Sequence, residues 1–392
     1  MFRKIIIFIS LFGFSFTKSS NHAMHLTAND FSLFWIIPFL GILFSIAILP
    51  LIKPSFWHHN YGKVSFFWGA LFLILFSIYF SEYTIFYLLE VYLREFFPFI
   101  MLLLALYTVS GGILISGNIN GTPKLNTSIL LIGTSLASIM GTTGASMLLI
   151  RPLIRANKDR KHKVHLIVFF IFLVSNIGGS LTPIGDPPLF LGFLKGVDFS
   201  WTIFNMYKPM IFVSLILLII FFVIDSYYYK NESTVKLNDE SLSIKINGKI
   251  NFVLIFGIIC AVILSGLPQF QNSIFSYQGT SMMTMGAFLQ LTILIIITFI
   301  SLKITPKELR QENSFTWEPI KEVAKLFATI FLTMIPAIEM LKGVTKGIGP
   351  MSWMKSTLID NNGNNIDFMY FWLTGILSSF LDNAPTYVVF FT

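Results

Sequence analysis

Long apolar runs are the feature that most restricts what this chain can fold into. Examples are 33–52, 64–80, 207–224, 252–267 and 285–302. A helix needs about 20 mostly apolar residues to cross the hydrocarbon of a bilayer. The 392 residues are 55% hydrophobic and 12% charged, whereas a soluble domain carries roughly 25% charged residues. A soluble fold could not cover so much apolar surface, so we predict an all-α, polytopic membrane protein.

The loops between the apolar runs predict the orientation. Complete spans are expected at 33–52, 64–82, 97–116, 207–229, 249–267, 282–302 and 320–342. Eighteen Lys and Arg residues lie in the loops 53–63, 117–127, 151–163, 230–249 and 303–325, against seven in the other segments after residue 17. By the positive-inside rule these five loops are cytoplasmic. The net charge of +8 therefore reflects membrane topology, and the expected partner is the lipid bilayer, not nucleic acid.

The first 23 residues resemble a signal-type segment. Arg3 and Lys4 precede a short apolar stretch, 5–16, and a polar stretch follows it. A signal peptide cleaved near Ala23 and an uncleaved first helix both fit this pattern. The single cysteine, Cys260, lies inside an apolar run, so neither a disulfide nor a thiol metal site is expected.

The segment 128–150 is apolar but has helix-breaking residues at its centre. Gly141, Thr142, Thr143 and Gly144 make a poor helix interior. The loop orientation requires this segment to enter and leave on the cytoplasmic side. We therefore expect a re-entrant hairpin whose tip faces a polar cavity. The alternative is a face of small residues for helix packing.

The segment 164–197 is predicted to be a discontinuous helix whose halves meet in the middle of the bilayer. Each proline removes a backbone donor and obstructs the preceding turn, so no continuous helix fits. Asp186 is the only carboxylate between Asp159 and Asp198, and at that depth it is a functional candidate. The alternative is an exposed loop. The polar and helix-breaking residues are Ser175, Asn176, Gly178, Gly179, Pro183, Gly185, Asp186, Pro187 and Pro188.

A third interrupted run, 371–391, contains Ser378, Ser379, Asp382, Asn383 and Pro385. By the loop count it enters from the outside, opposite to the first hairpin. Opposite entry of similar broken elements indicates an inverted repeat. The alternative is a terminal helix with a proline kink. The predicted organisation is a first repeat at 33–229, a cytoplasmic linker at 230–248 and a second repeat at 249–392.

Three motifs resemble the NhaD-type sodium/proton antiporters, which belong to the wider ArsB/NhaD and citrate-transporter-like group. They are GTSLASIMGTTGASMLLIRPLIRAN, VSNIGGSLTPIGDPPLFLGFLKGV and LSSFLDNAPTYVVFF, and the resemblance runs from about residue 33 to the end. It implies two inverted repeats, each with one re-entrant hairpin and one broken helix, and secondary transport by a homodimer. The implied site residues are Thr142, Thr143, Ser175, Asn176, Asp186, Ser379, Asp382 and Asn383.

The chain departs from that family at its end. Members continue into a second broken helix with an asparagine-proline motif, whereas this sequence stops at Thr392. Pairing the repeats gives the same gap, because 164–197 has no counterpart. The second repeat is therefore expected to be truncated, through a shortened product, a degraded gene or completion by a second polypeptide.

The main functional hypothesis is a sodium/proton antiporter of a bacterial inner membrane. Sodium would bind between backbone carbonyls and the side chains of Asn176, Asp186 and Asp382, and a midplane carboxylate can exchange sodium for a proton. No Lys or Arg lies between Lys163 and Lys195, which favours a cation over the alternative substrates citrate, another carboxylate or arsenite. A second alternative is an inactive remnant or membrane interaction protein. No cofactor and no enzymatic activity are expected.

Overall fold

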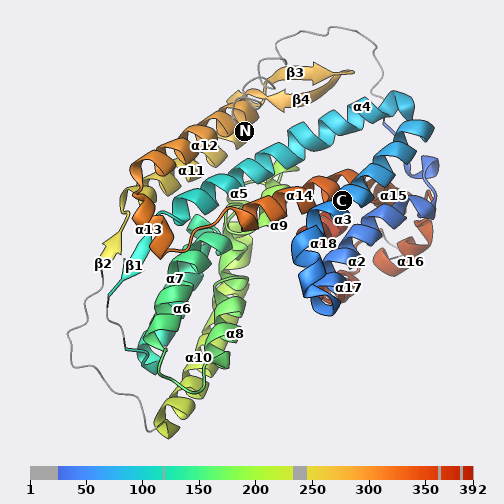
Figure 1. The fold of residues 1–392 in the computed structure, drawn as a ribbon. Coiled ribbons are helices and arrows are strands. Elements are labelled where there is room, and N and C mark those ends of the chain that lie inside the picture. Colours follow the sequence, from blue (N-terminus) through green and yellow to red (C-terminus); the bar gives the residue numbers. More distant parts are fainter. Residues whose placement is uncertain (1–24, 118–119, 233–244, 361–362, 380–382, 392) are drawn as a thin grey trace.

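The computed structural model describes residues 25–117, 120–232, 245–360, 363–379 and 383–391, and the predicted signal-type segment lies outside them. Helices make up most of this part of the chain (Figure 1). They are α2 (Ile37–Ile52), α3 (Pro54–Tyr79), α4 (Ser81–Leu89), α5 (Phe97–Ser110), α6 (Pro123–Met140), α7 (Thr142–Ala156), α8 (Val164–Leu173), α9 (Pro187–Leu194), α10 (Trp201–Asn231), α11 (Ile250–Gly266), α12 (Met285–Ile304), α13 (Lys307–Glu312), α14 (Glu318–Thr333), α15 (Ile335–Lys346), α16 (Lys355–Leu358), α17 (Asp367–Ser378) and α18 (Asn383–Phe391).

Two small antiparallel strand pairs complete the fold. Strand β1 (Leu114–Ser116) pairs with β2 (Lys245–Asn247), with Leu114 opposite Asn247. Strand β3 (Ser273–Tyr277) pairs with β4 (Thr280–Thr284) between α11 and α12. The first pair joins the chain after α5 to the chain before α11, so it connects segments that are about 130 residues apart in sequence.

The predicted all-α, polytopic class is confirmed. Five helices among the described residues are long and apolar enough to cross a membrane, and the pair α14–α15, bent by 46°, makes a sixth if it is counted as one span. The bend lies at Met334, and Pro336 follows in the first turn of α15. The pairing of two inverted repeats and the division into 33–229, 230–248 and 249–392 stay predictions.

Two predicted boundaries were wrong. The segment 53–63 is not a loop, because α3 begins at Pro54, and proline suits the first turn of a helix, where its missing donor costs nothing. The span expected at 97–116 is the second half of a longer helical run. That run continues from α4 through a π-helical segment (Glu90–Phe96) into α5, and it ends at Ser110, before Gly111 and Gly112.

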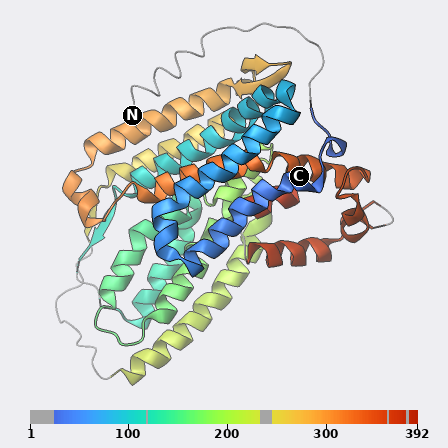
Figure 2. The ribbon, with the colours of Figure 1, turned by 45° about the vertical axis from the view of Figure 1, so that its right-hand side comes forward.

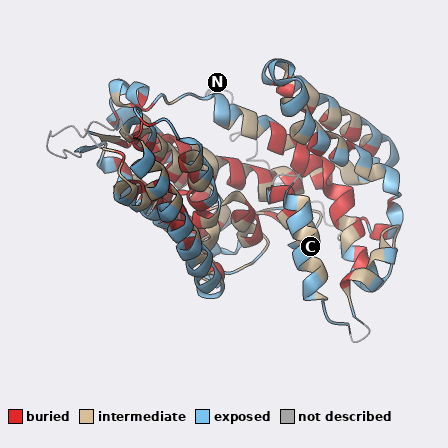
Figure 3. Cartoon of the chain, turned by 90° about the horizontal axis from the view of Figure 1, so that it is seen from below, coloured by how far each residue is buried: buried red, intermediate tan, exposed pale blue. Residues whose placement is uncertain are grey.

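The helices form three groups around a buried centre. Helices α6, α7, α8 and α10 lie together, α5 lies with α11 and α12, and α2 packs on α3 beside α14 (Figures 1 and 2). Buried residues concentrate in the middle of the molecule, and exposed residues cover the outer faces (Figure 3). Helix α5 is buried over most of its length from Pro98 to Ser110 and contacts α7, α9, α11, α12 and α14. It is the central helix of the fold.

Two buried polar side chains join the ends of α5, α11 and α12. The Asn251 amide donates to the Gly112 carbonyl at 3.0 Å, and its oxygen accepts from Ser301 Oγ at 2.7 Å. The Arg310 guanidinium donates to the carbonyl of Thr108 at 2.7 Å and to that of Ser301 at 3.0 Å. A cation at a helix carboxyl end is favourable, although burial lowers the pKa of Arg310 from its ordinary value.

We predict that Asn251→Ala lowers stability, because it leaves buried partners on α5 and α12 without their hydrogen bonds. The expected loss is about 1–3 kcal/mol, to be measured by thermal unfolding of the purified protein in detergent. Asn205→Ala is the matched control, since the exposed Asn205 amide bonds only to Trp201 O within its own helix. Equal losses in both variants would contradict this account of the junction.

Candidate ion-binding site

The hairpin predicted at 128–150 is formed by α6 and α7, and its apex is Gly141. The backbone of Gly141 has φ +79°, a conformation that favours glycine. This single residue ends α6 at Met140 and starts α7 at Thr142. The apex touches the broken helix directly, because the Thr142 amide donates to the Gly185 carbonyl at 2.9 Å.

The helix predicted to be discontinuous is broken between α8 and α9. A 3₁₀ turn (Ile177–Leu181) follows α8, and Pro187 and Pro188 start α9. The chain is too tightly packed here for side chains at the glycines. A Cβ on Gly185 would lie 2.1 Å from Gly179 O, and one on Gly179 would lie 2.6 Å from Thr142 Cγ2. Gly179 and Gly185 therefore allow the backbone on each side of the break to pack against the hairpin apex.

Ser138 on α6 ties the hairpin to the break, and the sequence analysis did not identify it. Its hydroxyl donates to the Gly178 carbonyl and accepts from the Leu181 amide at 3.2 Å, while its carbonyl accepts from the Thr182 hydroxyl. These bonds satisfy backbone groups that the interrupted helix leaves without partners. The signal in the sequence was weak: a hydroxyl residue three positions before Gly141, in a run that also contains Thr134 and Ser135.

Asp186 is the most distinctive residue at the break. It occupies the N-cap position of α9, and its carboxylate accepts from Thr142 Oγ1 at 3.4 Å. Thr142 is the first residue of α7. The amino ends of two helices therefore meet at this carboxylate, a position where negative charge is favourable. Asp186 is partly exposed and Thr142 is 6% exposed.

The other predicted residues of the first repeat lie nearby with different partners. Ser175 Oγ is 2.9 Å from Ser146 Oγ of α7, a second link between the hairpin and the broken helix. Thr143 is exposed and borders a cavity of about 70 Å³. Asn176 lies in the break, its amide donates back to Ile171 O in the last turn of α8 at 2.9 Å, and the residue is exposed. The structure thus places Thr142 in contact with Asp186, whereas the Asn176 side chain bonds to α8 and not to Asp186.

The third interrupted segment forms α17 and α18. Asp382 lies outside the described residues. Ser379 is exposed and its hydroxyl donates to Gly375 O at 2.8 Å, while Asn383 begins α18 and is exposed. Pro385 is buried, and α18 packs against α9 and α15. The binding roles of Ser379, Asp382 and Asn383 therefore stay predictions.

Two cavities lie next to the broken helix. The smaller, about 70 Å³, borders the hairpin apex and is lined by residues of α5, α6, α7 and α14 and of the break, without a charged side chain among them. The larger, about 540 Å³, lies at the other end of α9. Its lining includes Arg94, Asp198 and Gln290, and the Gln290 amide nitrogen is buried without a hydrogen-bond partner. Among the described residues there is no cluster of His, Cys, Asp and Glu that could hold a metal.

The sequence comparisons assign a family. Residues 28–392 match the sequence profile of a family described as "Putative citrate transport". The chain belongs to this family. The comparisons with curated proteins and with solved structures gave no match. The family supports the predicted citrate-transporter-like group and a transport protein of the membrane, but it does not single out the NhaD-type antiporters.

We predict that Gly185→Ala separates the hairpin apex from the break, because its methyl group would overlap the Gly179 carbonyl. Overpacking typically costs about 1–3 kcal/mol, so thermal unfolding in detergent should occur at a lower temperature. Gly375→Ala in α17 is the control, since a Cβ there meets nothing within 4 Å. If Gly185→Ala is as stable as Gly375→Ala, the close packing at the break is not required.

Proposed function

We propose that this protein is a secondary active transporter that binds a small cation at the helix break. Membership of a transport family supports the general class. The docking of a helical hairpin on a discontinuous helix supports the mechanism, because irregular backbone at bilayer depth is found where it lines a binding site. Alternating access would then arise from movement of the elements that carry this site.

The contact between Asp186 and Thr142 is the observation that carries the cation proposal. A carboxylate and a hydroxyl supply the hard oxygen ligands that alkali and alkaline-earth cations prefer. The carbonyls of the nearby break offer further oxygens. A carboxylate can hold either sodium or a proton, so exchange of sodium for protons is the simplest coupled reaction at this site.

The size of the cavity beside the apex agrees with a small ion. Pockets for small molecules are roughly 300–1,000 Å³, whereas this cavity is about 70 Å³. One water occupies about 30 Å³ of the liquid. The space beside Thr142 and Thr143 is therefore large enough for an ion with one or two waters but too small for an organic anion, and it lies next to Asp186 without being lined by it.

The second candidate is transport of a citrate-like anion. The description of the family favours it, and so does the larger cavity of about 540 Å³, which has the size of a small-molecule pocket. The Arg94 guanidinium and the unpaired Gln290 amide can both donate hydrogen bonds to a carboxylate in this cavity. In that case the cation at Asp186 would be the coupling ion.

We predict that Asp186→Asn abolishes cation transport, because the amide removes the charge that holds the ion. The purified protein would be reconstituted in proteoliposomes, and proton movement would be followed after a sodium gradient is imposed. Glu308→Gln, which removes an exposed carboxylate on α13, should leave transport unchanged.

The outcomes separate the candidates. Unchanged transport by Asp186→Asn would refute the proposed cation site. Sodium-dependent uptake of labelled citrate, without sodium/proton exchange, would replace the antiporter by the second candidate. No movement of sodium, protons or citrate would contradict transport and favour the inactive remnant.

A further inference from the structure

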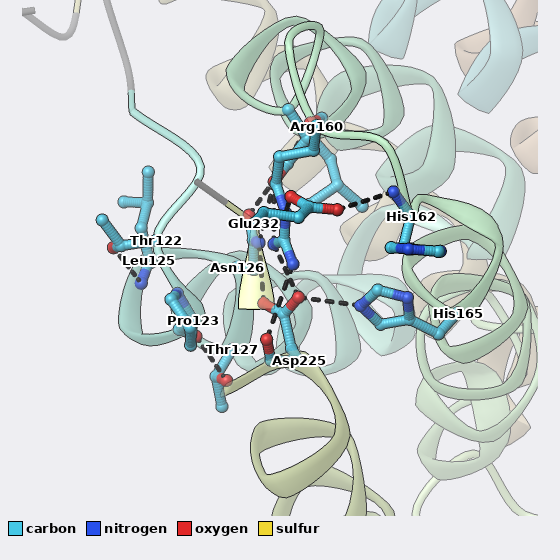
Figure 4. A network of polar contacts seen from close by, with 12 residues as sticks. Thr122, Pro123, Leu125, Asn126, Thr127, Arg160, His162, His165, Asp225 and Glu232 are labelled. Carbon is cyan, nitrogen blue, oxygen red and sulfur yellow. Dashed lines mark hydrogen bonds and ion pairs between the residues drawn. The ribbon is translucent and has the colours of Figure 1, made fainter. Parts of the chain in front are cut away.

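A second buried polar cluster lies away from the helix break, on the side predicted to be cytoplasmic. It gathers side chains from the first turns of α6, the loop after α7, the first turn of α8 and the carboxyl end of α10 (Figure 4). We call it the basal cluster, and its members are Asn126, Asn157, Arg160, His165, Asp225 and Glu232. It joins both ends of the hairpin to the broken helix and to α10.

Asp225 is the centre of the basal cluster and is completely buried. Its carboxylate accepts from Arg160 at 2.6 Å, from His165 Nε2 at 2.7 Å and from the Asn126 amide at 2.9 Å. The three partners come from three different segments. Loss of any one contact would therefore loosen a different part of the hairpin or the broken helix.

Arg160 connects Asp225 to a second carboxylate. Its Nε lies 3.3 Å from Glu232 Oε2, and its Nη1 donates to Asn157 Oδ1 at 3.3 Å. The guanidinium also lies over the Tyr229 ring. Glu232 in turn accepts from the backbone amide of His162 at 2.7 Å.

The charges of the basal cluster do not balance when His165 is neutral. One guanidinium faces two carboxylates, and the three side chains are at most 4% exposed. The other titratable groups near His165 are Tyr228, whose ring stacks on the His165 ring, and His162, whose ring also stacks on Tyr228. The remaining charged side chains of these segments are exposed, and solvent screens them: Lys124, Lys158, Asp159, Lys161, Lys163 and Lys230.

We propose that the basal cluster is a proton-binding site, separate from the ion site at the helix break, and that His165 binds the proton. Histidine is the side chain that ordinarily changes charge between pH 5 and 8. A proton on His165 neutralises the excess negative charge in a buried environment, where an unbalanced charge is costly. The proton strengthens the attachment of α8 to α10 through Asp225.

The proton site has a structural consequence for the hairpin. Asn126 and Asn157 bond to each other at 2.8 Å and hold the two ends of the hairpin that carries Thr142. Helix α8, which carries His165, leads directly into the break before Asp186. Protonation therefore holds the hairpin, the broken helix and α10 together, and deprotonation at higher pH weakens this connection.

We predict that the unfolding temperature of the full chain in detergent is roughly 2–4 °C higher at pH 6.0 than at pH 8.0 because of His165. A proton that links His165 to Asp225 in the folded protein stabilises it at low pH, and this contribution is lost as the pH rises. His165→Gln keeps a side-chain donor but cannot be charged, so its profile should be flatter by that amount. His162→Gln is the matched control and should keep the wild-type profile.

A second variant tests the charge balance without altering the histidine. Glu232→Gln removes one of the two carboxylates, so the pH-dependent change should move to lower pH, because less negative charge remains to attract the proton. The proposal is overturned if His165→Gln keeps the wild-type slope, or if His162→Gln loses it. Should His165→Gln not fold, an unshifted profile in Glu232→Gln overturns the proposal by itself. Both readouts are independent of transport activity.

Discussion

A helix can be interrupted inside a bilayer only if other parts of the protein satisfy the freed backbone groups, because the hydrocarbon offers no hydrogen bonds. Here the hairpin of α6 and α7 meets that requirement. Thr142 donates to Gly185 O, and Ser138 bonds to Gly178 O and to the Leu181 amide. The break at 174–186 and the hairpin apex are therefore one structural unit, and the candidate ion site lies where they meet.

The glycines and prolines allowed much of this unit to be predicted. Gly141 and the cluster around Asp186 break the helical pattern locally, and local breaks are visible in a sequence. The contacts of Ser138 with residues 178–182 are not, since they join positions about 40 residues apart. Asp225 had a visible signal that went unused: it is a carboxylate inside the predicted span 207–229. Such residues are functional candidates by default.

The basal cluster and the helix break share the same elements at opposite ends. Helices α6 and α7 hold Asn126 and Asn157 at one end and the apex at the other. The Lys and Arg residues of 151–163 predicted only the orientation of the membrane protein, because charge counts do not show which groups are buried. In the structure Arg160 is 3% exposed, so one loop both contributes to the positive-inside bias and anchors the hairpin.

Sodium binding by purified Thr142→Val protein is the measurement that tests the central claim most directly. Valine keeps the shape of threonine but removes the hydroxyl that contacts Asp186. If the hairpin apex and the break together form a cation site, sodium affinity measured by calorimetry falls by about tenfold or more, as expected for the loss of a hydrogen-bonded ligand to a charged group. Unchanged sodium affinity in a folded Thr142→Val variant would contradict the account.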